Sequence, residues 1–308
     1  MRDMLTRIGG FDLCVSEFVR VSQQRYPASV FYHLCPELKN GGRTPAGVPV
    51  HVQIMGGEAG VMADNAAFAA ELGAPGIDIN FGCPAKTVNR HDAGATLLQW
   101  PERLYGIVSA VRRAVPECVP VSAKMRLGFA DKSLALENAL AVEAAGAGKL
   151  TIHARTKMEG YRPPAHWEYL RPIRERLCIP VVANGEIWTM ADYEKCREIS
   201  GCDDVMVGRG VIARPGLGCE IMASRKGSIR SPAFGWPEIL TLIGEYRQLI
   251  TGMGNPPREA GRLKQWTKLL GRTYPTATDL FMAIRRFDDP RDIMTVVKKM
   301  EQMAMAAA

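Results

Sequence analysis

Short apolar runs alternate with longer helical patterns along most of this chain, and this alternation limits the fold more than any other feature. Seven runs have the length and the apolar, often β-branched content of strands: 12–17, 49–54, 77–81, 120–127, 150–154, 180–184 and 204–207. Helical spacing appears between them, at 60–72, 102–115, 132–145, 167–177 and 190–199. Because parallel strands need long crossover connections, this order predicts an α/β fold of the TIM (β/α)8-barrel type.

A closed barrel of this type needs eight strands, and the sequence shows seven. Residues 1–8 have the pattern of the end of a first helix, so the strand that should precede that helix does not appear in the chain. We favour a true start upstream of Met1 over a natural truncation. Without a first strand, closure of the barrel would be in question.

A second domain is predicted after the last strand. Residues 223–236 are rich in Gly, Ser, Pro and Arg and show no periodicity, which is typical of a linker. Helical spacing then returns four times, at 237–251, 258–272, 276–287 and 290–303. We therefore expect a barrel with the active site over residues 1–222, a linker over 223–236 and a small helical bundle over 237–308.

The net charge of +7 lies almost entirely in the last part of the chain. Residues 1–220 carry 25 Lys and Arg against 24 Asp and Glu, whereas residues 221–308 carry 14 against 8. A basic helical domain is compatible with nucleic-acid binding, although solvated helices often carry surplus lysine.

Cysteine usage and hydropathy indicate a cytoplasmic protein. The eight cysteines form no C-x-x-C pair, so we expect neither a disulfide framework nor a metal site. No apolar run is long enough to span a membrane, and the first ten residues lack the apolar core of a signal peptide.

The most informative motif is the segment from Gly76 to Pro84, with the sequence GIDINFGCP. A buried strand that stops at Gly-Cys-Pro would deliver Asn80 and Cys83 to the carboxyl edge of the sheet, where barrel enzymes place their chemistry. The alternative is a cysteine that only fills space before a proline turn.

Polar and basic residues recur at the ends of other predicted strands. Gln53 closes one strand, Lys124 and Arg126 alternate on another, and His153 alternates with Arg155 on a third. Such side chains are costly to bury unless a ligand or an ion pair compensates them, so they are candidate ligand-binding residues.

The last two strands end in glycine-bearing segments that suit a phosphate. The first is Asn184-Gly185-Glu186, and the second is Gly208-Arg209, which leads into a helical pattern. Barrels commonly bind phosphate with the loops that follow strands seven and eight. Two ordinary β-turns are the alternative.

In order and spacing these motifs resemble the tRNA-dihydrouridine synthases, and the resemblance covers the chain from Phe11 to the C-terminal helices. The C branch of that family is the most similar, through Cys14-Val-Ser-Glu-Phe-Val-Arg-Val21, Cys35-Pro-Glu-Leu38, Gly82-Cys-Pro-Ala-Lys-Thr-Val-Asn89 and Leu263-Lys-Gln-Trp266. The resemblance implies FMN as a tightly bound cofactor, NADPH as its reductant and a D-loop uridine of tRNA as substrate, at position 16 for this branch.

The chemistry implied by the resemblance assigns a role to each candidate residue. Reduction of the uracil 5,6 double bond needs a hydride at C6 and a proton at C5, and Cys83 would donate that proton. A thiol suits this task if it stays protonated, as an unperturbed cysteine does below about pH 8.5. Asn80 and Arg126 would hold the uracil. The FMN would be bound by Gln53, Lys124, His153, Asn184, Gly185, Glu186, Gly208 and Arg209.

Contacts with the rest of the tRNA are expected from Arg20, Arg262 and Lys264, which can neutralise phosphates. Trp266 is more typical of a helical core than of a stacking platform. The polar segment 86–96 is predicted to be a mobile lid.

Two other functions fit parts of the pattern. One is an FMN oxidoreductase that acts on a free pyrimidine, and the other is a non-catalytic tRNA-binding barrel that has lost its flavin. We expect the first alternative to bind tRNA poorly and the second to lack flavin absorption. The protein is expected to act as a monomer.

Overall fold

The computed structural model describes residues 1–85, 89, 92–227 and 234–306. Its contacts divide the chain into two compact units. The sheet unit comprises residues 12–187 and 191–207, and the helical unit comprises residues 1–11, 188–190 and 208–308. The predicted domain boundaries at 222 and 237 stay a prediction, because a division by contacts does not show which segment folds independently.

The sheet unit is built on parallel strands in the order β1-β3-β4-β5-β6-β7-β8, with β2 also paired to β3. The strands are β1 (Cys14–Val15), β2 (Val19–Arg20), β3 (Val50–Met55), β4 (Ile77–Phe81), β5 (Val121–Gly128), β6 (Leu150–Thr156), β7 (Val181–Asn184) and β8 (Asp204–Met206). All named pairings are parallel, which confirms the barrel-type α/β fold. Among the described residues, β8 pairs with β7 and has no pairing with β1, so this sheet is open.

Of the first predicted strand, 12–17, only Cys14–Val15 (β1) is a strand, and a second short strand, β2, follows the predicted range at Val19–Arg20. Both β1 and β2 pair with β3, and Ser16 lies between them. The Ser16 amide donates to the His51 carbonyl (2.9 Å). The Ser16 hydroxyl accepts the amide N–H of Gln53 (3.0 Å), so a side chain replaces one backbone bond of the ladder. The interruption explains why Arg20 belongs to a separate strand.

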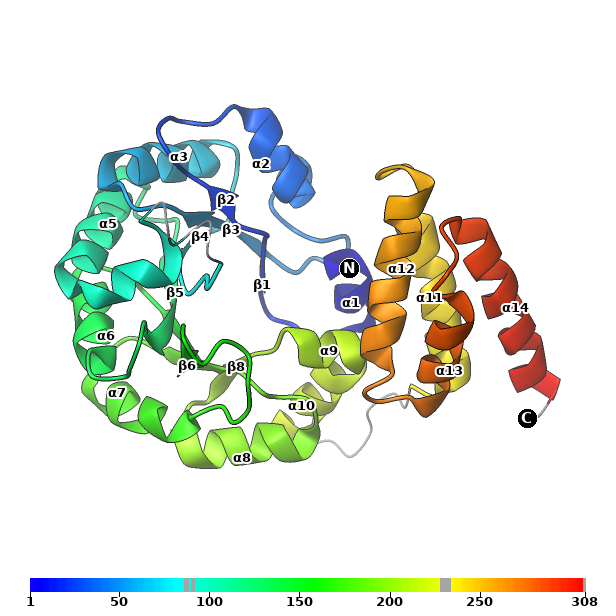
Figure 1. Ribbon diagram of the computed structural model, residues 1–308. Coiled ribbons are helices and arrows are strands. Elements are labelled where there is room, and N and C mark those ends of the chain that lie inside the picture. Colours follow the sequence, from blue (N-terminus) through cyan, green and yellow to red (C-terminus); the bar gives the residue numbers. More distant parts are fainter. Residues whose placement is uncertain (86–88, 90–91, 228–233, 307–308) are drawn as a thin grey trace. The chain divides into compact units, whose positions relative to one another are not determined.

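Helices cover the outer face of the sheet, as Figure 1 shows for the arc from α3 to α8. They are α3 (Ala59–Glu71), α5 (Pro101–Ala114), α6 (Ala135–Ala144), α7 (Leu170–Arg176) and α8 (Met190–Ser200). Shorter elements in this unit are α2 (Ala28–Leu34), η1 (Pro36–Asn40), η2 (Gly94–Gln99) and η3 (Trp167–Tyr169). Each strand presents its apolar residues to these helices; on β4 these are Ile77, Ile79 and Phe81, all fully buried. Burial of each such side chain contributes about 2 kcal/mol.

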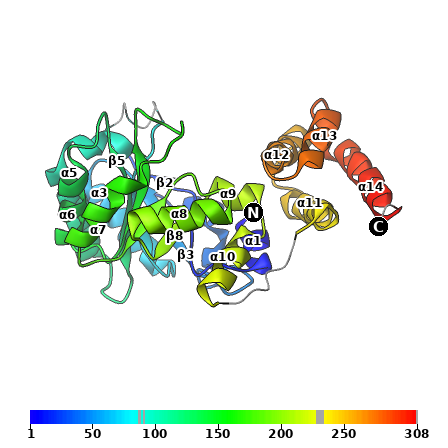
Figure 2. The same cartoon turned by 90° about the horizontal axis from the view of Figure 1, so that it is seen from below.

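The helical unit consists of α1 (Arg2–Ile8), α9 (Arg209–Ala213), α10 (Leu217–Arg225), α11 (Trp236–Ile250), α12 (Pro256–Leu270), α13 (Pro275–Ile284) and α14 (Pro290–Ala306). Figure 2 shows the last four helices as one group, in which α11 packs on α14 and α12 packs on α13. Asn255 caps α12 by accepting the Arg258 amide (3.1 Å), and Pro256 occupies the first turn, where its missing N–H is harmless. These helices confirm the four that the sequence predicts.

Trp266 belongs to the core of the helical unit. Its side chain is buried, its indole N–H donates to the Ile212 carbonyl (2.9 Å), and its ring meets the Tyr246 ring edge-on at 4.9 Å. The helix α1 also packs on α11, with Arg7 3.5 Å from Glu245. Across the part of the chain that the structure describes, no helix is both long and apolar enough to cross a lipid bilayer.

Candidate active site

One face of the sheet is lined by polar side chains at the carboxyl ends of its strands. The register pairs Gln53 with Asp78, and Asp78 with Ser122. One layer further along, Asn80 pairs with Lys124. Higher still, His153 pairs with both Arg126 and Asn184. Because paired residues of neighbouring strands project from the same face, these side chains form one surface. Barrel interiors are usually filled by branched apolar residues, so this polar surface indicates a binding site.

Cys83 follows β4 by two residues and is partly buried. Its side chain packs against the small cluster of Met55 and Ala93, as does that of Phe18. Its carbonyl accepts the amide N–H of Ala95 (3.1 Å) and the side-chain amide of Asn89 (2.9 Å). The turn that carries the thiol is therefore fixed from both sides. Residues 86–88 and 90–91 of the predicted lid, 86–96, lie outside the described residues.

A continuous hydrogen-bond chain leads from this turn into the sheet. The Gly82 amide donates to Asn80 Oδ1 (2.8 Å), and Asn80 Nδ2 donates to Gln53 Oε1 (2.8 Å). Gln53 Nε2 then donates to Asp78 Oδ2 (2.6 Å), and Ser122 Oγ donates to Asp78 Oδ1 (2.7 Å). The structure thus brings the predicted residues Gln53 and Asn80 together directly beneath Cys83.

Asp78 is a site residue that the sequence analysis missed. Its position alternates with Asn80 on a strand that is otherwise apolar, and this pattern could have revealed a buried carboxylate with obligatory partners. Burial raises the pKa of Asp78, against the opposing effects of the hydrogen bonds from Ser122 and Gln53 and of the Lys124 charge.

Lys124 and Asn184 meet across three strands, as the sequence predicts for a shared ligand site. Lys124 Nζ donates to Asn184 Oδ1 (2.9 Å), and Asn184 Nδ2 donates to the Met206 carbonyl (2.8 Å). The pKa of Lys124 is lowered to about 8, chiefly by burial; the Asp78 charge opposes this change and the nearby Arg126 charge contributes to it. A cation held with so little solvent is a strong partner for an anionic or electron-rich ligand.

Arg126 is almost completely buried and is engaged by backbone carbonyls. Its Nε donates to Gly82 (2.8 Å), and its Nη1 donates to Thr156 (3.0 Å) and Gly160 (2.8 Å). The Tyr161 ring lies 5.2 Å from its guanidinium carbon. Burial lowers the pKa of Arg126. Arg126 therefore joins the turn before Cys83 to the loop after β6, and a direct contact with uracil stays a prediction.

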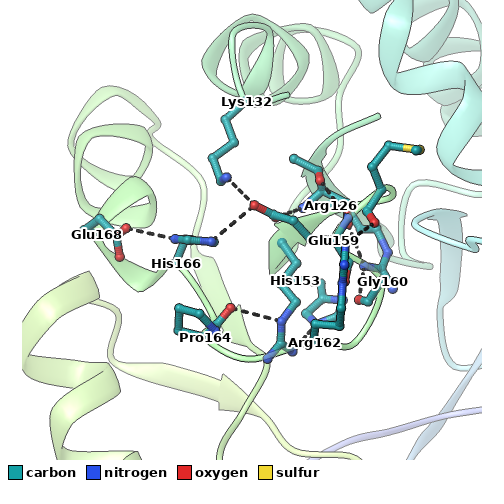
Figure 3. Close-up of polar contacts among 12 residues, drawn as sticks. Arg126, Lys132, His153, Glu159, Gly160, Arg162, Pro164, His166 and Glu168 are labelled. Atoms are coloured by element: carbon teal, nitrogen blue, oxygen red, sulfur yellow. Dashed lines mark hydrogen bonds and ion pairs between the residues drawn. The ribbon is translucent and has the colours of Figure 1, made fainter. Parts of the chain in front are cut away.

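The loop after β6 is held by Glu159, as Figure 3 shows beside Arg126. Glu159 Oε1 lies 2.5 Å from Lys132 Nζ and 3.2 Å from His166 Nε2, and Glu159 Oε2 accepts the Thr156 amide (2.6 Å). These partners keep the pKa of Glu159 below its usual value despite the opposing effect of burial. The loop is thereby fixed in the shape that presents Gly160 to Arg126.

His153, Gly185 and Glu186 form a second group on the same surface. The His153 ring is buried, and its Nε2 lies 3.4 Å from Arg155 Nη1. The fully buried Arg155 in turn forms an ion pair with Glu186. Gly185 has a φ of +118°, and a Cβ there would lie 2.8 Å from His153 Cδ2, so only glycine fits. The carboxylate of Glu186, a residue predicted to bind the cofactor, is thus neutralised by Arg155.

The remaining predicted residues lie elsewhere. Gly208 and Arg209 follow β8 at the start of α9 and belong to the helical unit, so their part in a phosphate site with Asn184 stays a prediction. Arg209 lies 5.2 Å from the Trp188 ring, and Arg272 lies 3.8 Å from the same ring. Arg20 is exposed on β2.

Arg262 and Lys264 lie on α12 and differ in their surroundings. Arg262 Nη1 contacts the Met253 sulfur (3.6 Å), whereas Lys264 Nζ donates to the Phe287 carbonyl (2.8 Å) and lies 3.2 Å from Asp288. Within the described ranges, no group of three or more His, Cys, Asp or Glu side chains is arranged to hold a metal ion.

A family model described as dihydrouridine synthase (Dus) matches residues 1–268. The chain is 52% identical over 289 residues to the tRNA-dihydrouridine(16) synthase of Aquipseudomonas alcaligenes, covering 94% of this chain and 91% of that protein. It is 44% identical over 304 residues to the tRNA-dihydrouridine(16) synthase of Neisseria meningitidis serogroup B, covering 98% and 91%.

Two solved structures share the fold at low sequence identity. Histamine dehydrogenase from Rhizobium sp. 4-9 has a TM-score of 0.53 and 14% identity, over 79% of this chain and 45% of that chain. DHODH from Eimeria tenella, solved with ferulenol, has a TM-score of 0.50 and 14% identity, over 78% and 77%.

Proposed function

Because this chain belongs to the dihydrouridine synthase family, we propose that it reduces the uridine at position 16 of tRNA to dihydrouridine, with FMN as cofactor and NADPH as reductant. The observation that carries the proposal is the placement of Cys83. The thiol follows the carboxyl end of a buried parallel strand and is held there by the hydrogen-bond chain through Asn80.

The residues of the polar surface fit a flavin. Lys124 is a desolvated cation, and the amides of Gln53 and Asn184 lie on the same face of the sheet. Such groups match the polar edge of the isoalloxazine ring, whose reduced form carries negative charge. At Gly208 an added Cβ would meet nothing within 4 Å, so backbone there is open to close approach by a phosphate. We assign Gln53, Lys124, His153 and Asn184 to the ring and ribityl chain, and Gly208 and Arg209 to the phosphate.

When bound, FMN supplies the hydride that adds to C6 of the uracil ring. Cys83 gives its proton to C5, so that the double bond between C5 and C6 becomes single and the thiolate later regains a proton from water. Negative charge that develops at C5 spreads into the C4 carbonyl. We assign the orientation of the uracil to Asn80 and Arg126, which lie next to the Cys83 turn.

The substrate must be turned out of the tRNA fold to reach Cys83, because a stacked base is inaccessible. We assign the supporting phosphate contacts to Arg20, Arg262 and Lys264. Such contacts position the RNA but do not read its sequence. The charge excess of residues 221–308 favours such a role for the helical unit.

Purified protein tests the proposal in a comparison of two substrates. With FMN and NADPH present, unmodified tRNA should acquire dihydrouridine at position 16, detected by nuclease mapping and mass spectrometry, while free uridine should stay unreduced. Equal reduction of free uridine would instead favour an oxidoreductase of free pyrimidines. Protein that neither takes up FMN nor modifies tRNA would contradict the assignment.

A further inference from the structure

The hydrogen-bond chain beneath Cys83 has a fixed direction, and Asp78 sets it. An ionised carboxylate can only accept hydrogen bonds. Gln53 must therefore turn its NH2 group toward Asp78 Oδ2, which leaves its carbonyl oxygen facing Asn80. Asn80 must in turn present its NH2 group to Gln53, which leaves Asn80 Oδ1 to accept the Gly82 amide.

Reversal of either amide would break this order. If Gln53 turned over, its NH2 group would face the NH2 group of Asn80, and Asn80 would have to turn as well. Asn80 Nδ2 would then face the Gly82 N–H, and the bond immediately before Cys83 would be lost. Asp78 is only 2% exposed and Gln53 only 6%, so these groups depend on one another for their hydrogen bonds.

The surroundings of Asp78 support this role. Ser122 donates to Oδ1 of the Asp78 carboxylate, and Gln53 donates to the other oxygen, Oδ2. Burial raises the pKa of Asp78, but the Lys124 charge and both hydrogen bonds favour its ionised, acceptor-only form.

We propose that Asp78 is a positioning residue, whose carboxylate orients the amides of Gln53 and Asn80 and thereby fixes the turn that carries Cys83. The proposal deepens the function assigned above and rests on it only for the role of the thiol. The orientation of the turn is a property of the protein alone, and it can be measured without turnover.

Two substitutions of Asp78 separate its acceptor from its charge. Asp78→Val replaces the carboxylate with an apolar side chain and so removes the acceptor that orients Gln53. Asp78→Asn can keep the order, because its carbonyl can accept from Gln53 while its NH2 group donates to Ser122 Oγ. Ser122 then directs its own proton to the Ile77 carbonyl, which lies 3.4 Å away. Ser122→Ala is the matched control, since it leaves Asp78 and everything between it and Cys83 in place.

The first measurement is the rate at which iodoacetamide alkylates Cys83 in the FMN-loaded protein, resolved from the other cysteines by peptide mass spectrometry. Asp78→Val should change this rate several-fold, whereas Asp78→Asn and Ser122→Ala should match the wild type. With tRNA, Asp78→Val should lower kcat about 100-fold with KM unchanged, as expected when a proton donor is misplaced by about 1 Å. A role in folding alone would lower the stability of Asp78→Val but would leave the alkylation rate and kcat of its folded fraction at the wild-type values.

A double variant keeps the test decisive if Asp78→Val does not fold. In Asp78→Asn with Ser122→Ala, the asparagine NH2 group has lost its acceptor, so the amide is free to turn over and present NH2 to Gln53. Cys83 alkylation should then change in the double variant although neither single variant changes it. Identical alkylation in all folded variants would overturn the proposal. If alkylation responds as expected but the wild type forms no dihydrouridine, the positioning role stands and the proposed function fails.

Discussion

Lys124 shows at the scale of one residue how burial prepares a side chain for a ligand. Its ammonium group has lost most of its water, and among the described contacts it donates a hydrogen bond to one oxygen, Asn184 Oδ1. The consequence is a pKa of about 8, well below that of an ordinary lysine. A ligand with negative charge would replace the missing water.

FMN binding should therefore depend on pH through Lys124. If the complex needs the protonated amine, FMN binding takes up a proton above about pH 8, and affinity should fall by up to about tenfold per pH unit from there. The guanidinium of Lys124→Arg stays protonated throughout this range, so the affinity of this variant for FMN should stay constant between about pH 7.5 and about pH 9.5. Fluorescence quenching of FMN measures both curves. The same steep fall in the variant would rule out Lys124 as its origin.

Cys83, Asn80 and Lys124 could be proposed from the sequence because each lies within or just after an apolar strand pattern, where polar residues are conspicuous. The apolar pattern around Asp78 could have indicated a buried carboxylate, but it could not show that its partners are Gln53 and Ser122, which come from two other strands. Nor could the sequence show that the Arg126 guanidinium is occupied by three carbonyls, because those acceptors come from backbone remote in sequence.

At the scale of elements, strand positions follow from local pattern and strand interruptions do not. The predicted strand 77–81 coincides with β4, because β-branched residues and the Gly-Cys-Pro stop define both ends. The predicted strand 12–17 is reduced to Cys14–Val15, because the Ser16 hydroxyl takes the place of a backbone group in the ladder at Gln53. A serine in an apolar run gives no sign of that contact. The start of α12 at Pro256, in contrast, can be recognised from the capping residue Asn255 and the proline that follows it.

Two strand-end glycines should respond differently to alanine. Gly185→Ala combines a φ of +118° with a Cβ contact of 2.8 Å to His153, so it should lower the free energy of unfolding by about 1–3 kcal/mol. Gly208→Ala meets no protein atom within 4 Å and has a negative φ, so stability without FMN should be unchanged.

The same pair tests the phosphate assignment. If FMN phosphate approaches the backbone at Gly208, the alanine variant should bind FMN more weakly while its chemical denaturation curve matches the wild type. Unaltered FMN affinity in Gly208→Ala would remove that residue from the site.

At the scale of the whole molecule, charge is distributed unequally along the chain. Residues 221–308 hold a net charge of +6, obtained from 14 basic and 8 acidic residues. Association with tRNA should accordingly weaken as the salt concentration rises, because the release of counterions from the RNA then contributes less free energy. Composition alone predicts this trend, but the role of each cation depends on its partners in the fold.

Substitution of Arg262 and of Lys264 should therefore affect different properties, tRNA binding for Arg262 and protein stability for Lys264. Arg262→Ala should weaken tRNA binding and reduce the slope of log affinity against log salt by about 1. Lys264→Ala loses its bond to Phe287 and its ion pair with Asp288, so it should lower the thermal stability of the protein more than Arg262→Ala does. Filter binding at several salt concentrations and thermal unfolding distinguish the two outcomes. An unchanged salt slope in Arg262→Ala would exclude a phosphate contact.

The role of the Cys83 thiol in completing the reduction of a tRNA uridine can be tested in cells. Dihydrouridine at position 16 can be mapped in tRNA from cells that lack this protein and are complemented with the wild type, Cys83→Ala or Cys118→Ala. The exposed Cys118 serves as the matched control. The wild type and Cys118→Ala should restore the modification, and Cys83→Ala should reduce its rate of formation by about 100-fold or more. Full restoration of dihydrouridine by Cys83→Ala would show that Cys83 is not the proton donor.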